Sequence, residues 1–175
     1  MMPTDGVHAD DPDDQPADAP ARPGERPFEG PEPTYDDAGL VFIGRIRSAW
    51  TDRAQCPKNV ARARETGEPA TIALDPRWRR GLTGLEPGGW VLLLTWLDRA
   101  ERNLALQMPR HADAPRGTFS LRSPVRPNPV GLHLVRIVSI DPETGVIAVD
   151  AIDVLDGTPL IDIKPYLASV DAPPA

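Results

Sequence analysis

The chain has 175 residues, which favours a single domain, and a formal net charge of −7 with a pI near 4.9. Taken over the whole chain, this acidity argues against a nucleic-acid-binding protein, because such proteins carry a basic surface. The single cysteine, Cys56, excludes an intrachain disulfide and a multi-thiolate metal site. No apolar run of about 18 residues could span a membrane, and the acidic N-terminus lacks the apolar segment of a secretory signal. We therefore expect a soluble, cytoplasmic protein.

The charge is unevenly distributed along the sequence. Residues 1–39 hold eleven acidic residues against two arginines, a net charge of −9, together with eight of the 22 prolines. Such a segment buries too little apolar surface to offset its ordering entropy, so residues 1–39 are predicted to be a disordered acidic tail. Residues 40–136 carry a net charge of +8, and residues 137–175 carry −6. The basic part is suited to contact RNA phosphates, which reverses the inference from the total charge.

In chain order, the expected elements are mostly short strands, because short apolar runs alternate or are rich in branched residues. The predicted strands are 41–48, 70–74, 90–97, 103–108, 118–121, 130–140, 146–151 and 159–163, with short helices at 59–65 and 76–82. The alternation around Leu132 and Leu134, followed by a turn at 141–145, predicts a hairpin with 146–149. This pattern predicts an all-β fold, a small closed or nearly closed β-barrel with short helices over residues 40–172. An open sandwich is the alternative.

The densest polar segment is RSPVRPNPVGLHLV, from Arg122 to Val135. Its three prolines within six residues predict a stiff loop rather than a helix. The guanidiniums of Arg122 and Arg126 are suited to bidentate contacts with a carboxylate or a phosphate, and Asn128 adds an amide donor and acceptor. The alternative is an exposed loop whose arginines pair with the acidic C-terminal segment.

A second polar segment is DAIDVLDGTPLIDIKPY, from Asp150 to Tyr166. Asp150, Asp153 and Asp156 recur every three residues, and clustered carboxylates of this kind can ligate a hard cation or accept hydrogen bonds from ribose hydroxyls. No histidine or second ligand set accompanies them, so no metal is expected. We favour the interpretation that the carboxylates not used by a ligand lie on a solvated strand face.

Together with FIGRIRSAW (42–50) and GLTGLEPGGWVLLLTW (81–96), these two segments resemble the TsaA-like, or TrmO-like, family. The similarity covers about residues 41–172, and its most specific motifs are RSPVRPNPVG and DVLDGTPLIDIKPY. The resemblance implies a small β-barrel that works as a homodimer and binds S-adenosyl-L-methionine near the subunit interface. It also implies methylation of N6-threonylcarbamoyladenosine beside the anticodon of tRNA.

The resemblance also implies candidate site residues. Those expected to bind the cofactor are Arg122, Leu132, Asp150, Ala151, Ile152, Asp153, Trp96 and Asn59, with packing in the core as the alternative for Trp96. Those expected on the tRNA side are Lys58, Arg126, Asn128 and Lys164. Arg122 is expected to hold the methionine carboxylate, and Asp153 to accept a hydrogen bond from the amine or the ribose. The alternative for Arg126 and Lys164 is an internal ion pair with Asp153, Asp156 or Asp162.

The chain departs from the family pattern at three places. Cys56-Pro57-Lys58-Asn59 stands where relatives commonly have Pro-Arg-Gln, Trp96-Leu97-Asp98 where a histidine is common, and His133 where a small hydroxyl residue is usual. Asp98 and His133 are candidate catalytic bases for the N6 proton, with water as the alternative and with a structural role as the alternative for His133. A thiol nucleophile is not expected. Two alternatives remain: a methyltransferase of the same fold acting on another RNA or a small molecule, and a non-catalytic barrel that binds cofactor or RNA.

Overall fold

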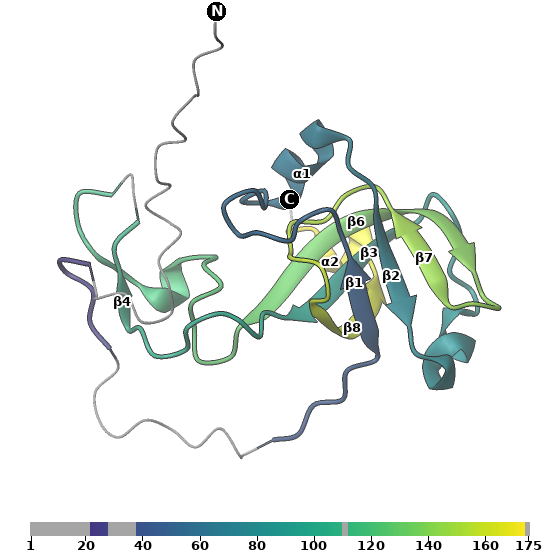
Figure 1. Cartoon of the computed structure of the whole chain (residues 1–175), viewed down its shortest axis with the longest axis horizontal. Coiled ribbons are helices and arrows are strands. Elements are labelled where there is room, and N and C mark those ends of the chain that lie inside the picture. The colour runs from purple at the N-terminus through teal and green to yellow at the C-terminus, as the bar shows by residue number, and fades with distance from the viewer. Residues whose placement is uncertain (1–21, 28–37, 110–111, 174–175) are drawn as a thin grey trace, which may run out of the picture.

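The computed structural model describes residues 22–27, 38–109 and 112–173 (Figure 1). Six antiparallel strands form a closed barrel in the order β1-β2-β7-β6-β3-β8. The strands are β1 (Gly44–Arg47), β2 (Ala70–Leu74), β3 (Trp90–Trp96), β6 (Val130–Asp141), β7 (Val146–Val149) and β8 (Pro159–Pro165). The predicted all-β barrel is confirmed rather than the open sandwich, and each strand pairs with two neighbours over at least part of its length.

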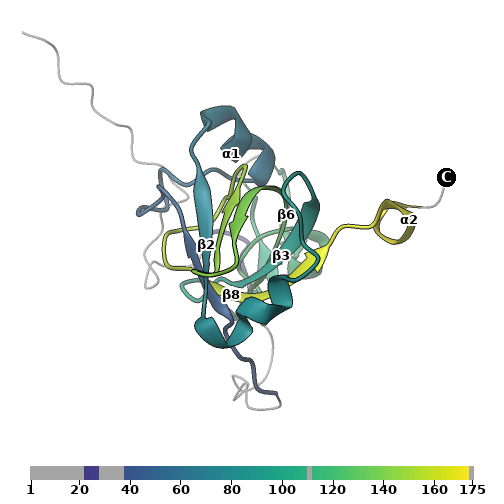
Figure 2. The same ribbon diagram turned by 90° about the vertical axis from the view of Figure 1, so that its right-hand side faces the viewer.

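Short helices connect or follow the strands. They are the α-helices α1 (Val60–Thr66) and α2 (Ala168–Asp171) and the 3-10 helices η1 (Pro76–Leu82) and η2 (Thr118–Ser120). Figure 2 shows α2 standing away from the barrel beyond the end of β8. In the described part of the chain, no helix is long and apolar enough to cross a membrane.

The barrel interior is filled by branched apolar side chains, because alternate residues of each strand point inward. The largest fully buried ones include Ile46, Ile72, Leu93, Ile137, Ile147 and Leu160. Each such side chain contributes about 1.5–3 kcal/mol when it is removed from water. The core also contains polar side chains, among them Thr95 on β3 and His133 on β6.

The predicted hairpin is formed by β6 and β7, whose register runs from Ile137↔Val149 to Asp141↔Val146. Gly145 closes the turn at a φ of 75°, a left-handed conformation that glycine adopts without strain. The two strands differ greatly in length, with 12 residues in β6 and 4 in β7. Residues 130–136 of β6 therefore extend beyond β7.

This extension leaves one side of β6 without a neighbouring strand. Hydrogen bonds run from Leu97 N to Pro129 O and from Ile137 N to Gly89 O. The odd-numbered residues of β6 therefore direct their N–H and C=O groups toward β3. The N–H and C=O groups of the even-numbered residues 130–136 consequently point away from β3, where the register gives them no strand partner. We call this side of residues 130–136 the open edge.

Between β3 and β6 the chain leaves the barrel and forms a lobe, comprising the described residues 98–109 and 112–129 (left in Figure 1). The lobe contains η2 and a two-stranded sheet of β4 (Leu106–Gln107) and β5 (Arg116–Gly117). The prediction of a strand at 118–121 is wrong, because Leu121 N bonds to Thr118 O and bends this segment into a 3-10 turn.

Part of the predicted N-terminal tail also contacts this lobe. Arg26 forms an isolated bridge with Leu106, with Arg26 N 3.3 Å from Leu106 O. Residues 1–21 and 28–37 lie outside the described residues, so the predicted disorder of the tail stays a prediction there.

Candidate functional site

The open edge is occupied by arginine side chains and by the segment that follows β7. Arg122 donates from Nη2 to Leu132 O at 3.2 Å, and Arg64 donates from Nη2 to Leu134 O at 2.6 Å. Further along, the backbone N of Asp150 donates to Arg136 O at 3.0 Å. Two guanidiniums thus satisfy carbonyls that a neighbouring strand would otherwise have bound.

Asp150 is fixed by two contacts. Its Oδ2 lies 2.6 Å from Arg64 Nε, and its Oδ1 accepts a 2.8 Å bond from the backbone N of Arg136. The Arg64 guanidinium also lies over the Trp90 ring, 5.2 Å from its centroid. Arg64 belongs to α1, so these contacts hold this helix beside the open edge, as Figure 1 shows.

Asp153 is joined to the barrel core through His133. The Oδ1 atom of Asp153 lies 2.6 Å from His133 Nδ1, and Nε2 of the same ring lies 2.9 Å from Thr95 Oγ1. Thr95 and His133 are buried, whereas the Asp153 side chain retains 16% exposure. A line of polar groups therefore runs from the core to the surface beside the open edge.

The loop after β1 packs against the other side of this segment. Trp50 Nε1 donates to Ile152 O at 2.9 Å, and Asp156 N donates to Trp50 O at 2.7 Å. Ala151 and Ile152 are buried, so they contribute packing and backbone groups at this position. The segment from Asp150 to Asp156 is thus held between the loop and β6.

The thiol of Cys56, in the same loop, has a pKa well above its ordinary value. Burial and then the negative charge of Asp153 raise the pKa of its thiol to about 12. This electrostatic effect also indicates that the loop and Asp153 are neighbours.

Asn59 is the N-cap of α1, and its side-chain oxygen accepts a 2.9 Å bond from Arg62 N. This explains locally why the helix begins there, since such caps satisfy an otherwise unpaired backbone donor. Lys58 precedes it and is exposed. Both residues come just before α1 in the chain, and α1 carries Arg64, which bonds Leu134 O at the open edge.

Trp96 and Asp98 lie where β3 leads into the lobe. The Trp96 ring lies under the Arg102 guanidinium, 5.3 Å away, and Arg102 Nε donates to Pro127 O at 2.7 Å. Trp96 pairs with Val130 on β6, and Asp98 is exposed in the following turn. These contacts connect Trp96 to the lobe, and no hydrogen bond described for it reaches Arg122 or Asp153.

The remaining candidates lie elsewhere. Arg126 donates from Nη2 to Thr118 O and Leu121 O, at 3.1 and 2.6 Å, so it holds the lobe together. Lys164 forms an exposed ion pair with Asp162 at 2.8 Å, as the alternative interpretation proposed, and this contact raises the pKa of the lysine. Asn128 is exposed, and its backbone O accepts a bond from Val130 N.

The structure thus places three sequence-derived candidates along the open edge, Arg122, Leu132 and Asp150, and a fourth, Asp153, beside it on His133. Sequence reasoning missed Arg64 and Thr95. Thr95 had a weak signal, as a lone hydroxyl in the apolar strand WVLLLTW, whereas Arg64 had none. No group of three or more metal-ligating side chains occurs among residues 22–27, 38–109 and 112–173.

These features define a small antiparallel barrel with a polar open edge on β6, and comparison with known proteins identifies its family. Residues 45–172 match the family model of the tRNA-methyltransferase O N-terminal domain, so the chain belongs to the TrmO family. It is 38% identical over 133 residues to the probable S-adenosyl-L-methionine-binding protein VirR of Rhizobium radiobacter, covering 76% of this chain and 73% of that protein.

Two further similarities concern proteins whose names specify tRNA or TrmO. A tRNA (adenine(37)-N6)-methyltransferase of Mus musculus is 46% identical over 68 residues, which cover 39% of this chain and 15% of that protein. The crystal structure of TrmO from Pseudomonas aeruginosa superposes with a TM-score of 0.60 at 30% identity. That match covers 77% of this chain and 58% of the crystallised chain, so this chain spans less than two thirds of its length.

Proposed function

We propose that this protein is an S-adenosyl-L-methionine-dependent tRNA methyltransferase that acts on N6 of N6-threonylcarbamoyladenosine in the anticodon loop. The observation that carries the proposal is the placement of Arg122, Leu132 and Asp150 along the open edge, with Asp153 beside it. Family membership and the names of the relatives, which specify S-adenosyl-L-methionine binding and tRNA adenine methylation, support it. The site of action is the cytoplasm.

The chemistry of the open edge fits this cofactor. The exposed Arg122 guanidinium complements the methionine carboxylate, and Asp153 Oδ2, which has no hydrogen-bond partner among the described residues, complements an ammonium or a ribose hydroxyl. The backbone N–H of Leu132, likewise unpaired in the described part of the chain, suits an acceptor nitrogen of adenine. When bound, the cofactor supplies an activated methyl group.

The task of the protein residues is then to orient the two reactants, because methyl transfer from a sulfonium to a nitrogen needs alignment more than covalent catalysis. The N6 proton goes to Asp98 or to water in our proposal. Asp98 is exposed in the turn between β3 and the lobe, whereas both ring nitrogens of His133 are already hydrogen-bonded in the core.

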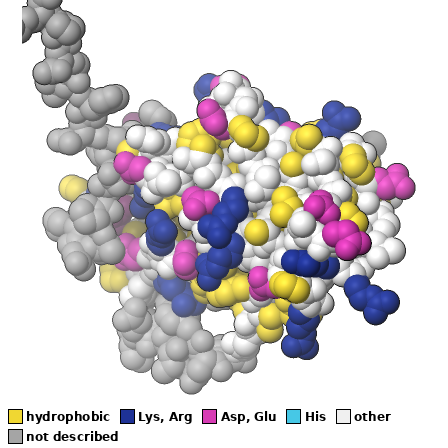
Figure 3. All heavy atoms as spheres, turned by 45° about the vertical axis from the view of Figure 1, so that its right-hand side comes forward, with side chains coloured by type: hydrophobic (Ala, Val, Ile, Leu, Met, Phe, Trp, Pro, Cys, Tyr) yellow, Lys and Arg dark blue, Asp and Glu magenta, His cyan; other side chains and the backbone are white. Residues whose placement is uncertain are grey.

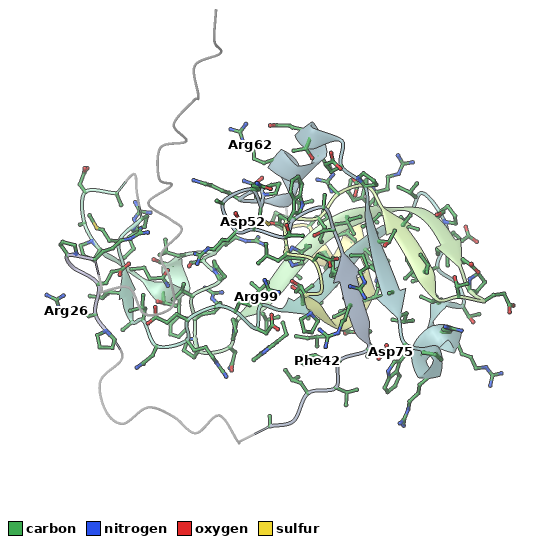
Figure 4. All side chains as sticks on the ribbon, in the orientation of Figure 1. Arg26, Phe42, Asp52, Arg62, Asp75 and Arg99 are labelled. Carbon is green, nitrogen blue, oxygen red and sulfur yellow. The ribbon has the colours of Figure 1, made fainter. Side chains whose placement is uncertain are left out.

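We assign the tRNA contact to the lobe and the adjoining barrel end. The described residues 22–27, 98–109 and 112–129 contain seven arginines (22, 26, 99, 102, 116, 122 and 126) and four acidic residues (25, 98, 101 and 113). Figure 4 shows Arg26 at the far end of the lobe, Arg99 where it joins the barrel, and Arg62 on α1. By contrast, basic and acidic side chains are interspersed on the face shown in Figure 3. Binding should therefore weaken steeply as salt rises.

The proposed assembly is a homodimer with the cofactor near the subunit interface. The outer face of β3 and β6 exposes Trp90, Val130, Leu132 and Leu134 to solvent by 36–47%. Val130, Leu132 and Leu134 follow one another on this face of β6, and Trp90 on β3 pairs with Arg136, diagonally across from Leu134, so they form one apolar surface. A second copy of this chain is the occupant that we propose, because Leu132 would then link the interface to the cofactor edge.

Two measurements test this function. Calorimetry with S-adenosyl-L-methionine should give binding by the folded protein, and absence of binding would remove the methyltransferase proposal. Incubation with labelled cofactor and tRNA, with and without the threonylcarbamoyl group, should label only the modified tRNA at adenosine. Labelling of unmodified tRNA or another RNA instead would favour a different methyl acceptor for the same fold.

A further inference from the structure

Thr95 and His133 have no role assigned so far, and they form a line of side chains that leads to Asp153. Thr95 is fully buried and His133 is 5% exposed, so two polar side chains occupy a core that apolar residues could fill. Burial of polar groups destabilises a fold unless their hydrogen bonds are satisfied. Each ring nitrogen of His133 does have a partner, Asp153 Oδ1 at 2.6 Å and Thr95 Oγ1 at 2.9 Å.

The backbone around this line leaves space for it. Gly131 is the register partner of Thr95, and a Cβ atom at residue 131 would lie 2.4 Å from Thr95 Oγ1 and 2.5 Å from His133 Nε2. Both separations are far below van der Waals contact, so any side chain at this position would displace the hydroxyl or the ring. The contact between Thr95 and His133 therefore depends on the glycine at residue 131.

The geometry selects one tautomer of His133. At 2.6 Å from a carboxylate oxygen, Nδ1 must carry a hydrogen, since two lone pairs would otherwise oppose each other. Nε2 then accepts from the Thr95 hydroxyl, which has no other acceptor in the described part of the chain. A hydrogen on Nε2 as well would make this nitrogen a donor and leave the Thr95 hydroxyl hydrogen without an acceptor among the described residues. The neutral ring with hydrogen on Nδ1 therefore satisfies every group.

We propose that His133 is a positioning residue for the cofactor site. Its Nδ1–H holds Oδ1 of Asp153, so that Oδ2 is presented at the open edge to the ammonium or a ribose hydroxyl of S-adenosyl-L-methionine. Thr95 keeps the ring in the required tautomer. This inference rests on the proposed function and adds residues that do not touch the cofactor themselves.

The first test is spectroscopic and needs no cofactor. Long-range 1H–15N NMR distinguishes the two histidine tautomers, and a spectrum of His133→Asn assigns the His133 signals among the three histidines of the chain. We expect hydrogen on Nδ1 in the wild type and a mixture of tautomers in Thr95→Val, which lacks the hydroxyl. Hydrogen on Nε2 in the wild type would overturn the proposal.

The second test compares cofactor affinities by calorimetry. His133→Leu removes the donor and should raise the dissociation constant tenfold or more, as loss of a bond to a charged group does. His133→Asn places an amide donor near the position of Nδ1 and should stay within about threefold of wild type by the same reasoning. Equal affinities of the two variants would contradict a positioning role.

Thr118→Val is the matched control for Thr95→Val, because it also removes a buried threonine hydroxyl. That hydroxyl accepts a 2.8 Å bond from Gln107 Nε2 in the lobe. This control should lower stability and leave the cofactor dissociation constant unchanged. If His133→Leu does not fold, Thr95→Val replaces it and should weaken binding measurably; wild-type affinity would then overturn the proposal. Failure of the wild type to bind would instead refute the proposed function.

Discussion

Arg64 of α1 and Asp150, the residue that follows β7, form a 2.6 Å ion pair whose side chains are 34% and 23% exposed. The same guanidinium bonds to Leu134 O and covers the Trp90 ring. One side chain therefore connects a short helix, a barrel strand and the segment that carries the aspartates. Since α1 has only 7 residues, its position depends on such tertiary contacts more than on its own helix stability.

We expect Arg64→Ala to lower the free energy of unfolding by about 1.5–3 kcal/mol, because it breaks charge-assisted bonds in a partly buried site. Arg62→Ala, in the same helix, is the control. Arg62 pairs with Glu65 at 3.0 Å, with both side chains more than 60% exposed. Such exposed pairs contribute about 0–1 kcal/mol. Denaturant unfolding measures both variants, and equal losses would contradict the anchoring role of Arg64.

Arg122→Ala should raise the dissociation constant for S-adenosyl-L-methionine tenfold or more, since a charge-assisted pair contributes about 1.5–3 kcal/mol. Arg79→Ala is a suitable control, because Arg79 also donates to a backbone carbonyl, Glu143 O at 2.7 Å, at the β6–β7 turn. Calorimetry should show wild-type affinity for the control. An unchanged constant for Arg122→Ala would place the cofactor elsewhere.

The thiol of Cys56 should ionise only far above its ordinary pKa of 9.0, because burial and Asp153 raise the pKa to about 12. Absorbance of the thiolate against pH measures this directly, since the chain has one cysteine. Asp153→Asn should lower the thiol pKa but leave it raised, because burial, the larger cause, remains. No change in this variant would contradict their proximity.

The same shift gives a stability prediction with a definite sign. Above pH 9.0 the unfolded thiol releases its proton while the folded thiol keeps it, so the unfolded state binds fewer protons. Stability should therefore decline as pH rises from 9.0 toward about 12, and the decline should be smaller in Cys56→Ala. Unfolding midpoints of the two proteins across this range give the comparison.

Leu134→Glu should convert the proposed dimer to a monomer, because a carboxylate would be buried without a partner in the apolar outer face of β3 and β6. Val138→Glu is the control on the same strand, since Val138 is 58% exposed beyond the apolar surface, in the part that pairs with β7. Analytical ultracentrifugation should find a dimer for this control and for the wild type. A monomeric wild type would contradict the assembly.

Sequence periodicity predicted the barrel strands well where one face of each strand is buried. The strand at 70–74 matches β2 to the residue, and 130–140 ends one residue before β6 does. Alternating burial appears in the sequence as an alternation of apolar and polar residues. In the lobe the predicted strand at 103–108 contains the short β4, whereas the one at 118–121 is wrong, since the Thr118 side chain turns back to bond Leu104 O.

The candidate site was predictable only in part. The motifs predicted Arg122, Leu132, Asp150 and Asp153, and the structure places them along or beside the open edge, although their role as cofactor ligands stays a prediction. The contact of Arg64 with Asp150 spans 86 positions, so no local pattern encodes it. The contact of Thr95 with His133 depends on strand register, which only the folded barrel fixes.

The unequal lengths of β6 and β7 make part of the main chain itself available for recognition. A ligand read by amide and carbonyl groups is insensitive to the side chains above them, so Leu132 and Leu134 are free to evolve for other purposes. The vulnerable parameter is strand length: lengthening β7 by two or three paired residues would fill the edge. Such an insertion would bind the N–H and C=O groups that Arg122, Arg64 and Asp150 now contact, and it would remove the edge on which the proposed cofactor site depends while the barrel stayed closed.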